Sequence, residues 1–64
     1  MLKPTWKYNV IKEIAKTLNI SKEDATVMVE ENDFTDYCYN RNYTAKSSAA
    51  IIMKINKKMI ERTN

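Results

Sequence analysis

Apolar positions along this chain recur with the period of an α-helix rather than with the alternation of a strand. After Ile11, further apolar residues follow at three, four and seven positions, and lysines occupy the opposite side. The same period returns in three later segments, of which the last is the longest. The pattern therefore predicts an all-α, compact single domain over residues 1–64, with four helices at about 5–18, 22–31, 34–40 and 45–62.

Residues suited to helix ends lie at the junctions between these segments. Asn19 can adopt the left-handed conformation that ends a helix, and Ser21 can accept a hydrogen bond from the backbone that opens the next one. Asn32 or Asp33 is expected to cap the third helix, and Thr44 is expected to cap the last. The sequence thus predicts tight corners without long loops.

The apolar faces of the four helices are expected to meet in one core. Val27 falls among acidic residues and Ile51 falls at the margin of its apolar face, so both are candidates for exposure. Trp6 and the tyrosines 8, 37, 39 and 43 suit either the core or a binding interface, and most are expected in the core. The residues predicted to be buried together are Ile11, Ile14, Leu18, Met28, Phe34, Ile52, Ile55 and Met59.

Composition removes several classes of function. The 64 residues contain no glycine, no histidine and one cysteine, so an internal disulfide, a Cys/His zinc site and a glycine-rich phosphate loop are excluded. Cys38, which has no histidine to activate it, is expected to be a buried apolar residue. The acidic pairs at 23–24 and 30–31 are adjacent, so their side chains diverge on a helix. We therefore expect no enzyme activity, no metal and no cofactor.

Hydropathy indicates a cytoplasmic protein. The first residues lack the apolar run of a signal peptide, and no segment approaches the ~20 apolar residues that span a membrane. No membrane association is expected.

Charge is distributed in three blocks. The formal net charge of +3 combines +3 in residues 1–20, −4 in residues 21–43 and +4 in residues 44–64. Such blocks can complement one another between copies, steer a charged partner, or solvate three faces of the domain. The sequence leaves these interpretations open, including a homo-oligomer.

Residues 11–28 carry a helix, a corner and a second helix: Ile14-Ala15, then Leu18-Asn19-Ile20, the cap Ser21, and Ala25 with Met28 on the packing face. This segment resembles the helix-turn-helix of bacterial and phage regulators. The resemblance implies that the second helix enters the major groove of DNA. The base-contacting positions that it implies are Lys22, Glu23, Thr26 and Val27.

The charge of the second helix favours another placement of nucleic acid. Residues 21–36 hold six acidic residues against one lysine, and phosphates repel such a surface. The last helix instead opens with short hydroxyls and continues with lysines, which suit phosphate. We therefore predict a small helix-turn-helix-like regulator that contacts DNA through its basic C-terminal helix. The predicted nucleic-acid-binding residues are Arg41, Tyr43, Thr44, Lys46, Ser47, Lys54, Lys57 and Lys58.

The alternative is a protein-binding modulator or inhibitor. Its acidic second helix would meet a basic protein partner, and a lysine- and asparagine-rich composition without glycine suits a phage or mobile-element factor. Lysines of the first and last helices merging on one surface would favour nucleic acid, whereas an exposed apolar patch beside the acids would favour protein. The residues of this alternative site are Glu23, Val27, Glu30 and Glu31.

Overall fold

A computed structural model describes the chain from residue 2 to residue 63, with side chains described for residues 2–56. Within that part there are four helices and no strand. The all-α fold predicted from the sequence is therefore confirmed. The helices are α1 (Lys3–Leu18), α2 (Lys22–Glu30), α3 (Phe34–Asn40) and α4 (Ala45–Thr63).

The helix limits differ from the predicted ones by at most two residues. α1 begins at Lys3 rather than at residue 5, because Pro4 occupies the first turn, where its fixed φ suits a helix. α2 ends at Glu30, one residue early, and α4 continues to Thr63, one residue beyond the expected end. These differences do not change the order of the elements.

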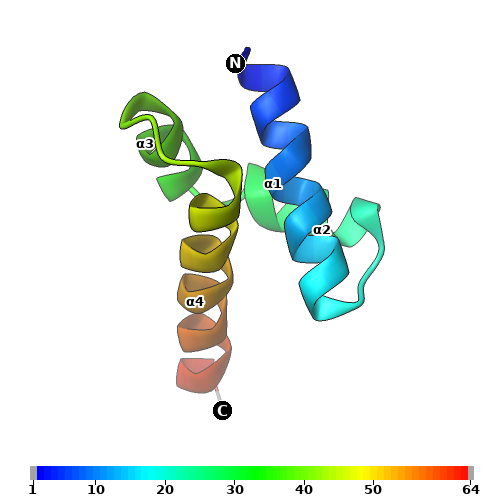
Figure 1. Cartoon of the computed structure of the whole chain (residues 1–64). Coiled ribbons are helices and arrows are strands. Elements are labelled where there is room, and N and C mark those ends of the chain that lie inside the picture. Colours follow the sequence, from blue (N-terminus) through cyan, green and yellow to red (C-terminus); the bar gives the residue numbers. More distant parts are fainter. Residues whose placement is uncertain (1, 64) are drawn as a thin grey trace.

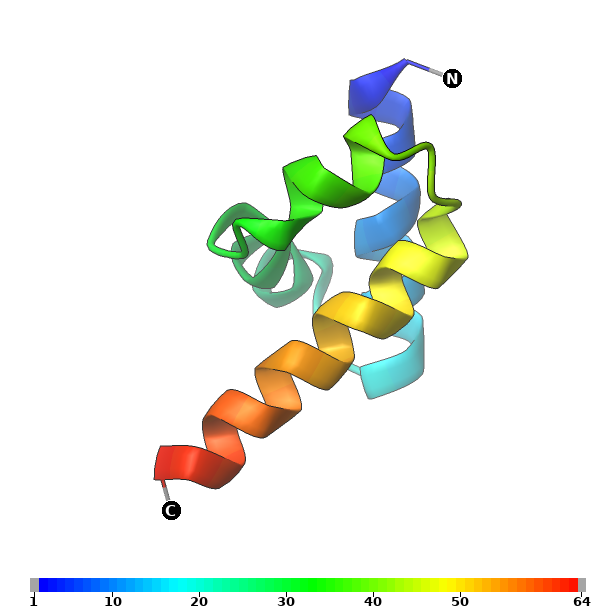
Figure 2. The same cartoon turned by 90° about the vertical axis from the view of Figure 1, so that its left-hand side faces the viewer.

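The longest helices, α1 and α4, pack on one another, while α2 lies against α1 and α3 lies against α4 (Figure 1). The molecule is elongated, measuring 38 × 23 × 16 Å. The second half of α4 extends beyond the other three helices, as Figure 2 shows from the side. The core therefore lies under the first half of α4.

The corner between α1 and α2 forms as the sequence predicts. Asn19 adopts the left-handed conformation with φ 54° and ψ 47°. The backbone N–H of Ile20 donates to the carbonyl of Ala15 at 3.0 Å, and the N–H of Asp24 donates to Oγ of Ser21 at 3.0 Å. Both helix ends are thus satisfied within three residues.

The ends of α3 and α4 are fixed by similar contacts. The Phe34 N–H donates to Oδ1 of Asn32 at 2.9 Å, whereas Asp33 forms no capping bond through its side chain. The Ser47 N–H donates to Oγ1 of Thr44 at 3.1 Å, which confirms the predicted cap. Between the two helices, Asn42 takes a positive φ of 61° and turns the chain.

Part of the predicted core is confirmed. Ile11, Ile14 and Ile52 are buried, and Cys38 is buried as expected. Three further predicted residues are only half-buried, two of which pack against the core, and Met59 lies outside the residues whose side chains are described. The half-buried residues are Met28, Phe34 and Ile55.

The prediction was wrong for Leu18, whose side chain is 44% exposed. Leu18 ends α1, and the chain turns at Asn19, so the helices that cover the middle of α1 do not cover this position. Ile51 was expected at the surface but is half-buried against the core. The buried side of α1 therefore runs through its middle turns rather than to its end.

Trp6 was a candidate interface residue, and the structure places it in the core, with 5% of its surface exposed. Its indole Nε1–H donates to the carbonyl of Tyr43 at 2.9 Å, and its ring meets Tyr39 edge to face at 5.2 Å. Trp6 and Val10 together extend the buried side of α1 toward the N-terminus. This tryptophan ties α1 to the segment that precedes α4.

The expectation that most of the aromatic residues lie in the core was wrong for the tyrosines. Tyr8, Tyr37 and Tyr43 are between 37% and 48% exposed, and Tyr39 is half-buried. A tyrosine can lie at the edge of a small core because its ring is apolar and its hydroxyl remains in water.

Two surface ion pairs connect α1 to its neighbours. Lys3 lies 2.8 Å from Asp36 of α3, and Lys7 pairs with Glu30 of α2. The hydrogen bond from Lys3 lowers the pKa of Asp36, and the same contact raises the pKa of Lys3. Because these four side chains are paired within the domain, their charges are less available to a binding partner.

Candidate functional site

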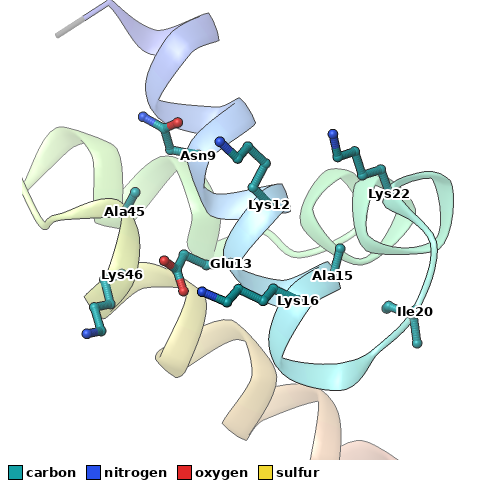
Figure 3. Close-up of a pocket in the computed structure, with 9 residues that line it drawn as sticks. All are labelled: Asn9, Lys12, Glu13, Ala15, Lys16, Ile20, Lys22, Ala45 and Lys46. Atoms are coloured by element: carbon teal, nitrogen blue, oxygen red, sulfur yellow. The ribbon is translucent and has the colours of Figure 1, made fainter.

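Residues of three helices surround a depression of about 690 Å³ on one side of the molecule, which we call the basic depression. Four lysines and one glutamate give it a formal charge of +3. Figure 3 shows these side chains around the depression. The lining residues are Asn9, Lys12, Glu13, Ala15, Lys16, Ile20, Lys22, Ala45 and Lys46.

The helix ends position these lysines. Lys12 and Lys16 are one turn apart on α1 and therefore share a side of that helix. Lys22 opens α2 directly after the cap of the corner, and Lys46 lies in the first turn of α4. Two helix N-termini, each with a partial positive charge, thus add to the field of the lysines.

Tyr8 lies beside the depression and contacts two of its lysines, Lys12 and Lys22. The Lys22 ammonium donates to the Tyr8 hydroxyl at 3.1 Å. The same ammonium lies 5.3 Å from the ring centroid, and that of Lys12 lies 5.6 Å from it. The hydrogen bond from Lys22, followed by its charge, lowers the pKa of the Tyr8 hydroxyl. An exposed tyrosine therefore joins α1 to the start of α2.

The predicted nucleic-acid-binding residues are distributed over several places. Lys46 lies in the basic depression, and Lys54 is exposed further along α4. Thr44 and Ser47 form the cap of α4 and are both exposed. Lys57 and Lys58 lie outside the residues whose side chains are described.

Arg41 and Tyr43 lie with the aromatic residues near α3. The Arg41 guanidinium lies 5.0 Å from the ring centroid of Tyr37, which Tyr43 also meets, edge to face at 6.3 Å. The rings of Tyr37 and Phe34 are 4.6 Å apart. Neither Arg41 nor Tyr43 lines the basic depression.

A second concave surface lies between α2, α3 and the middle of α4, and we call it the acidic groove. Its volume is about 450 Å³, and the described residues that line it include two acidic side chains and no basic one. Val27, which was expected to point outward, is 52% exposed in it. The lining residues are Val27, Met28, Glu31, Asn32, Asp33, Phe34, Ile55 and Asn56.

The four residues of the alternative protein-binding site do not form one surface. Val27 and Glu31 line the acidic groove, whereas Glu30 pairs with Lys7 on another side of α2. Glu23 is exposed and lines neither concave surface. Neighbouring residues on a helix differ by about 100° in direction, which separates Glu30 from Glu31.

Two residues of the basic depression, Lys12 and Lys16, were not predicted from the sequence, and Lys22 was named only as a position implied by the helix-turn-helix resemblance. The spacing of four between the first two was a usable signal, since it places both on one side of a helix. Their proximity to Lys46 required the packing of α1 on α4, which no local pattern encodes.

Within the described residues, no group of three or more histidine, cysteine or acidic side chains could hold a metal ion. None of the helices in that part of the chain is long and apolar enough to cross a membrane. Comparison with protein-family models, with curated proteins and with solved structures found no match to this chain.

Proposed function

We propose that this protein is a small regulator that binds nucleic acid through the phosphate backbone, using the basic depression. The observation that carries the proposal is that Lys12, Lys16, Lys22 and Lys46 come from three helices and line one concave surface. Phosphates that approach this surface would meet four ammonium groups and release counterions, which is the main driving force of backbone binding. Lysine acts here as a point charge and needs no fixed geometry.

The helix-turn-helix resemblance supports nucleic-acid binding on the same side of the molecule as the basic depression. The corner at residues 19–21 brings Lys22, the one basic residue of α2, to the basic depression. Glu31, the C-terminal cap of α2, lines the acidic groove, and none of the described residues of that groove lines the depression. DNA would therefore approach the N-terminal ends of α2 and α4.

Contacts of this kind position a duplex without reading its bases. The expected binding tolerates changes of base sequence and depends strongly on salt.

The test replaces Lys16 and Lys46 with glutamine and measures the fluorescence anisotropy of a labelled duplex of about 20 base pairs at several salt concentrations. The wild-type chain should bind, and the double variant should bind at least about tenfold more weakly at low salt. The slope of log K against log salt should fall by about 2, one unit for each lost phosphate contact.

The matched control replaces Lys3 and Lys7, which changes the net charge by the same amount away from the depression. Circular dichroism of both variants verifies their folding. Equal weakening by the two double variants would show that net charge alone governs binding and would refute the proposed site. Absence of any wild-type binding at micromolar protein and low salt would refute the function.

A further inference from the structure

The apolar stripe of α4 continues past the core of its own chain. Ser48 and Ile52 are fully buried, and Ile55 follows them at helical spacing as a half-buried wall of the acidic groove. The sequence places Met59 at the next position of the same spacing. The helix itself extends beyond α1, α2 and α3 (Figures 1 and 2).

The acidic groove beside this helix combines apolar and anionic character. Val27, Met28 and Phe34 give it an apolar lining, while Glu31 and Asp33 are the charged residues of its described lining. An occupant that matches both features is an amphipathic helix with a basic face. Charge complementarity thus restricts the chemistry of the occupant.

The chain itself contains such a helix. Residues 44–64 carry a formal charge of +4, and Lys54 is exposed next to Ile55 in the sequence. We propose that the protein forms a homodimer in which α4 of each copy lies in the acidic groove of the other. Lys54 would then approach Glu31 and Asp33 of the second copy, and Ile55 would pack near the centre of the interface.

The arrangement closes on itself. Ile55 belongs both to the wall of its own groove and to the stripe that enters the other groove, so two copies related by a two-fold axis satisfy one another. A 64-residue domain has a small core, and association is a common way for such domains to gain stability. None of the described residues lines both the basic depression and the groove, so the depression remains free for nucleic acid.

The experiment measures the oligomeric state of the full chain by sedimentation equilibrium, from about 10 µM to about 1 mM, in the range of moderate interface affinities. The wild-type chain should dimerise. Glu31→Lys reverses a groove charge and should raise the dissociation constant at least about tenfold. Glu23→Lys makes the same change of charge on α2 outside the groove and should leave the dissociation constant nearly unchanged.

The decisive experiment combines two variants in which the charges of residues 31 and 54 are reversed. Lys54→Glu alone should weaken the dimer as Glu31→Lys does, and an equimolar mixture of the two variants should recover dimers that neither forms alone. Recovery also shows that both variants are folded. A wild-type chain that stays monomeric at about 1 mM would overturn the proposal. So would equal effects of Glu31→Lys and Glu23→Lys, or a mixture that remains monomeric.

Discussion

The basic depression and the acidic groove share two helices, α2 and α4, but have opposite character. α4 separates them: Lys46 lines the depression and Ile55 lines the groove, nine positions apart, or two and a half turns. α2 also contributes to both surfaces, since its first residue lines the depression and residues of its last turn line the groove. The side and the end of each helix therefore decide the character of a surface, whereas the net charge of a segment does not.

The largest effect is expected from a substitution in the core, because both surfaces depend on the helix packing that the core maintains. Ile52 is fully buried in α4, so Ile52→Ala should lower the free energy of unfolding by about 2–5 kcal/mol through lost burial and a cavity. Urea denaturation measures the change. Such a loss is a large fraction of the stability of a small domain.

Leu18→Ala is the matched control, because it removes a similar volume from a side chain that is 44% exposed. Its effect should be clearly smaller, below about 1 kcal/mol. Equal effects of the two substitutions would show that Leu18 is buried in solution.

Substitutions at the helix caps should have a smaller effect on stability, and they should distinguish the basic depression from the acidic groove. Ser21 caps α2 next to Lys22, and Thr44 caps α4 two residues before Lys46. Replacing either cap by alanine should reduce the free energy of unfolding by about 1 kcal/mol and weaken nucleic-acid binding. Asn32→Ala, at the acidic groove, should lower stability but leave that binding unchanged.

Thermal unfolding and anisotropy titration measure these two quantities on the same samples. Ser47→Ala serves as the control for stability, because Ser47 donates its backbone N–H, and not its hydroxyl, to the cap of α4. If Asn32→Ala weakened nucleic-acid binding as much as Ser21→Ala, the two surfaces would not be separable.

The smallest expected effect concerns charges that belong to neither concave surface. The hydrogen bond and charge of Lys3 hold the pKa of Asp36 below its ordinary value of 3.8. Between the folded and unfolded pKa values the unfolded chain binds more protons, so this carboxylate contributes stability above that interval and loses it as the pH falls through the folded value.

Asp36→Asn should therefore lower the melting temperature slightly and evenly between about pH 5 and pH 9, where both partners of the ion pair are charged. The difference from the wild-type chain should vanish in acid, below the folded pKa of Asp36. Melting curves over this pH range test the prediction. A difference that persists unchanged in acid would show that the carboxylate charge is not its cause.

Local sequence determined the helices of this protein and their corners. Asn19, Ser21 and Thr44 act as their residue types predict, because a cap depends on a few neighbouring backbone groups. Helical periodicity also identified Ile11, Ile14 and Ile52 as core residues.

Only the tertiary structure decided which residues meet. The packing of α1 on α4 shifted the buried side of α1 toward Trp6 and Val10, left Leu18 exposed, and brought Lys16 to the same depression as Lys46. The acids of α2 were likewise divided when one of them paired with Lys7 of α1. Helical period fixes how residues are arranged around one helix, but the direction in which that helix faces its neighbours depends on contacts between residues far apart in the sequence.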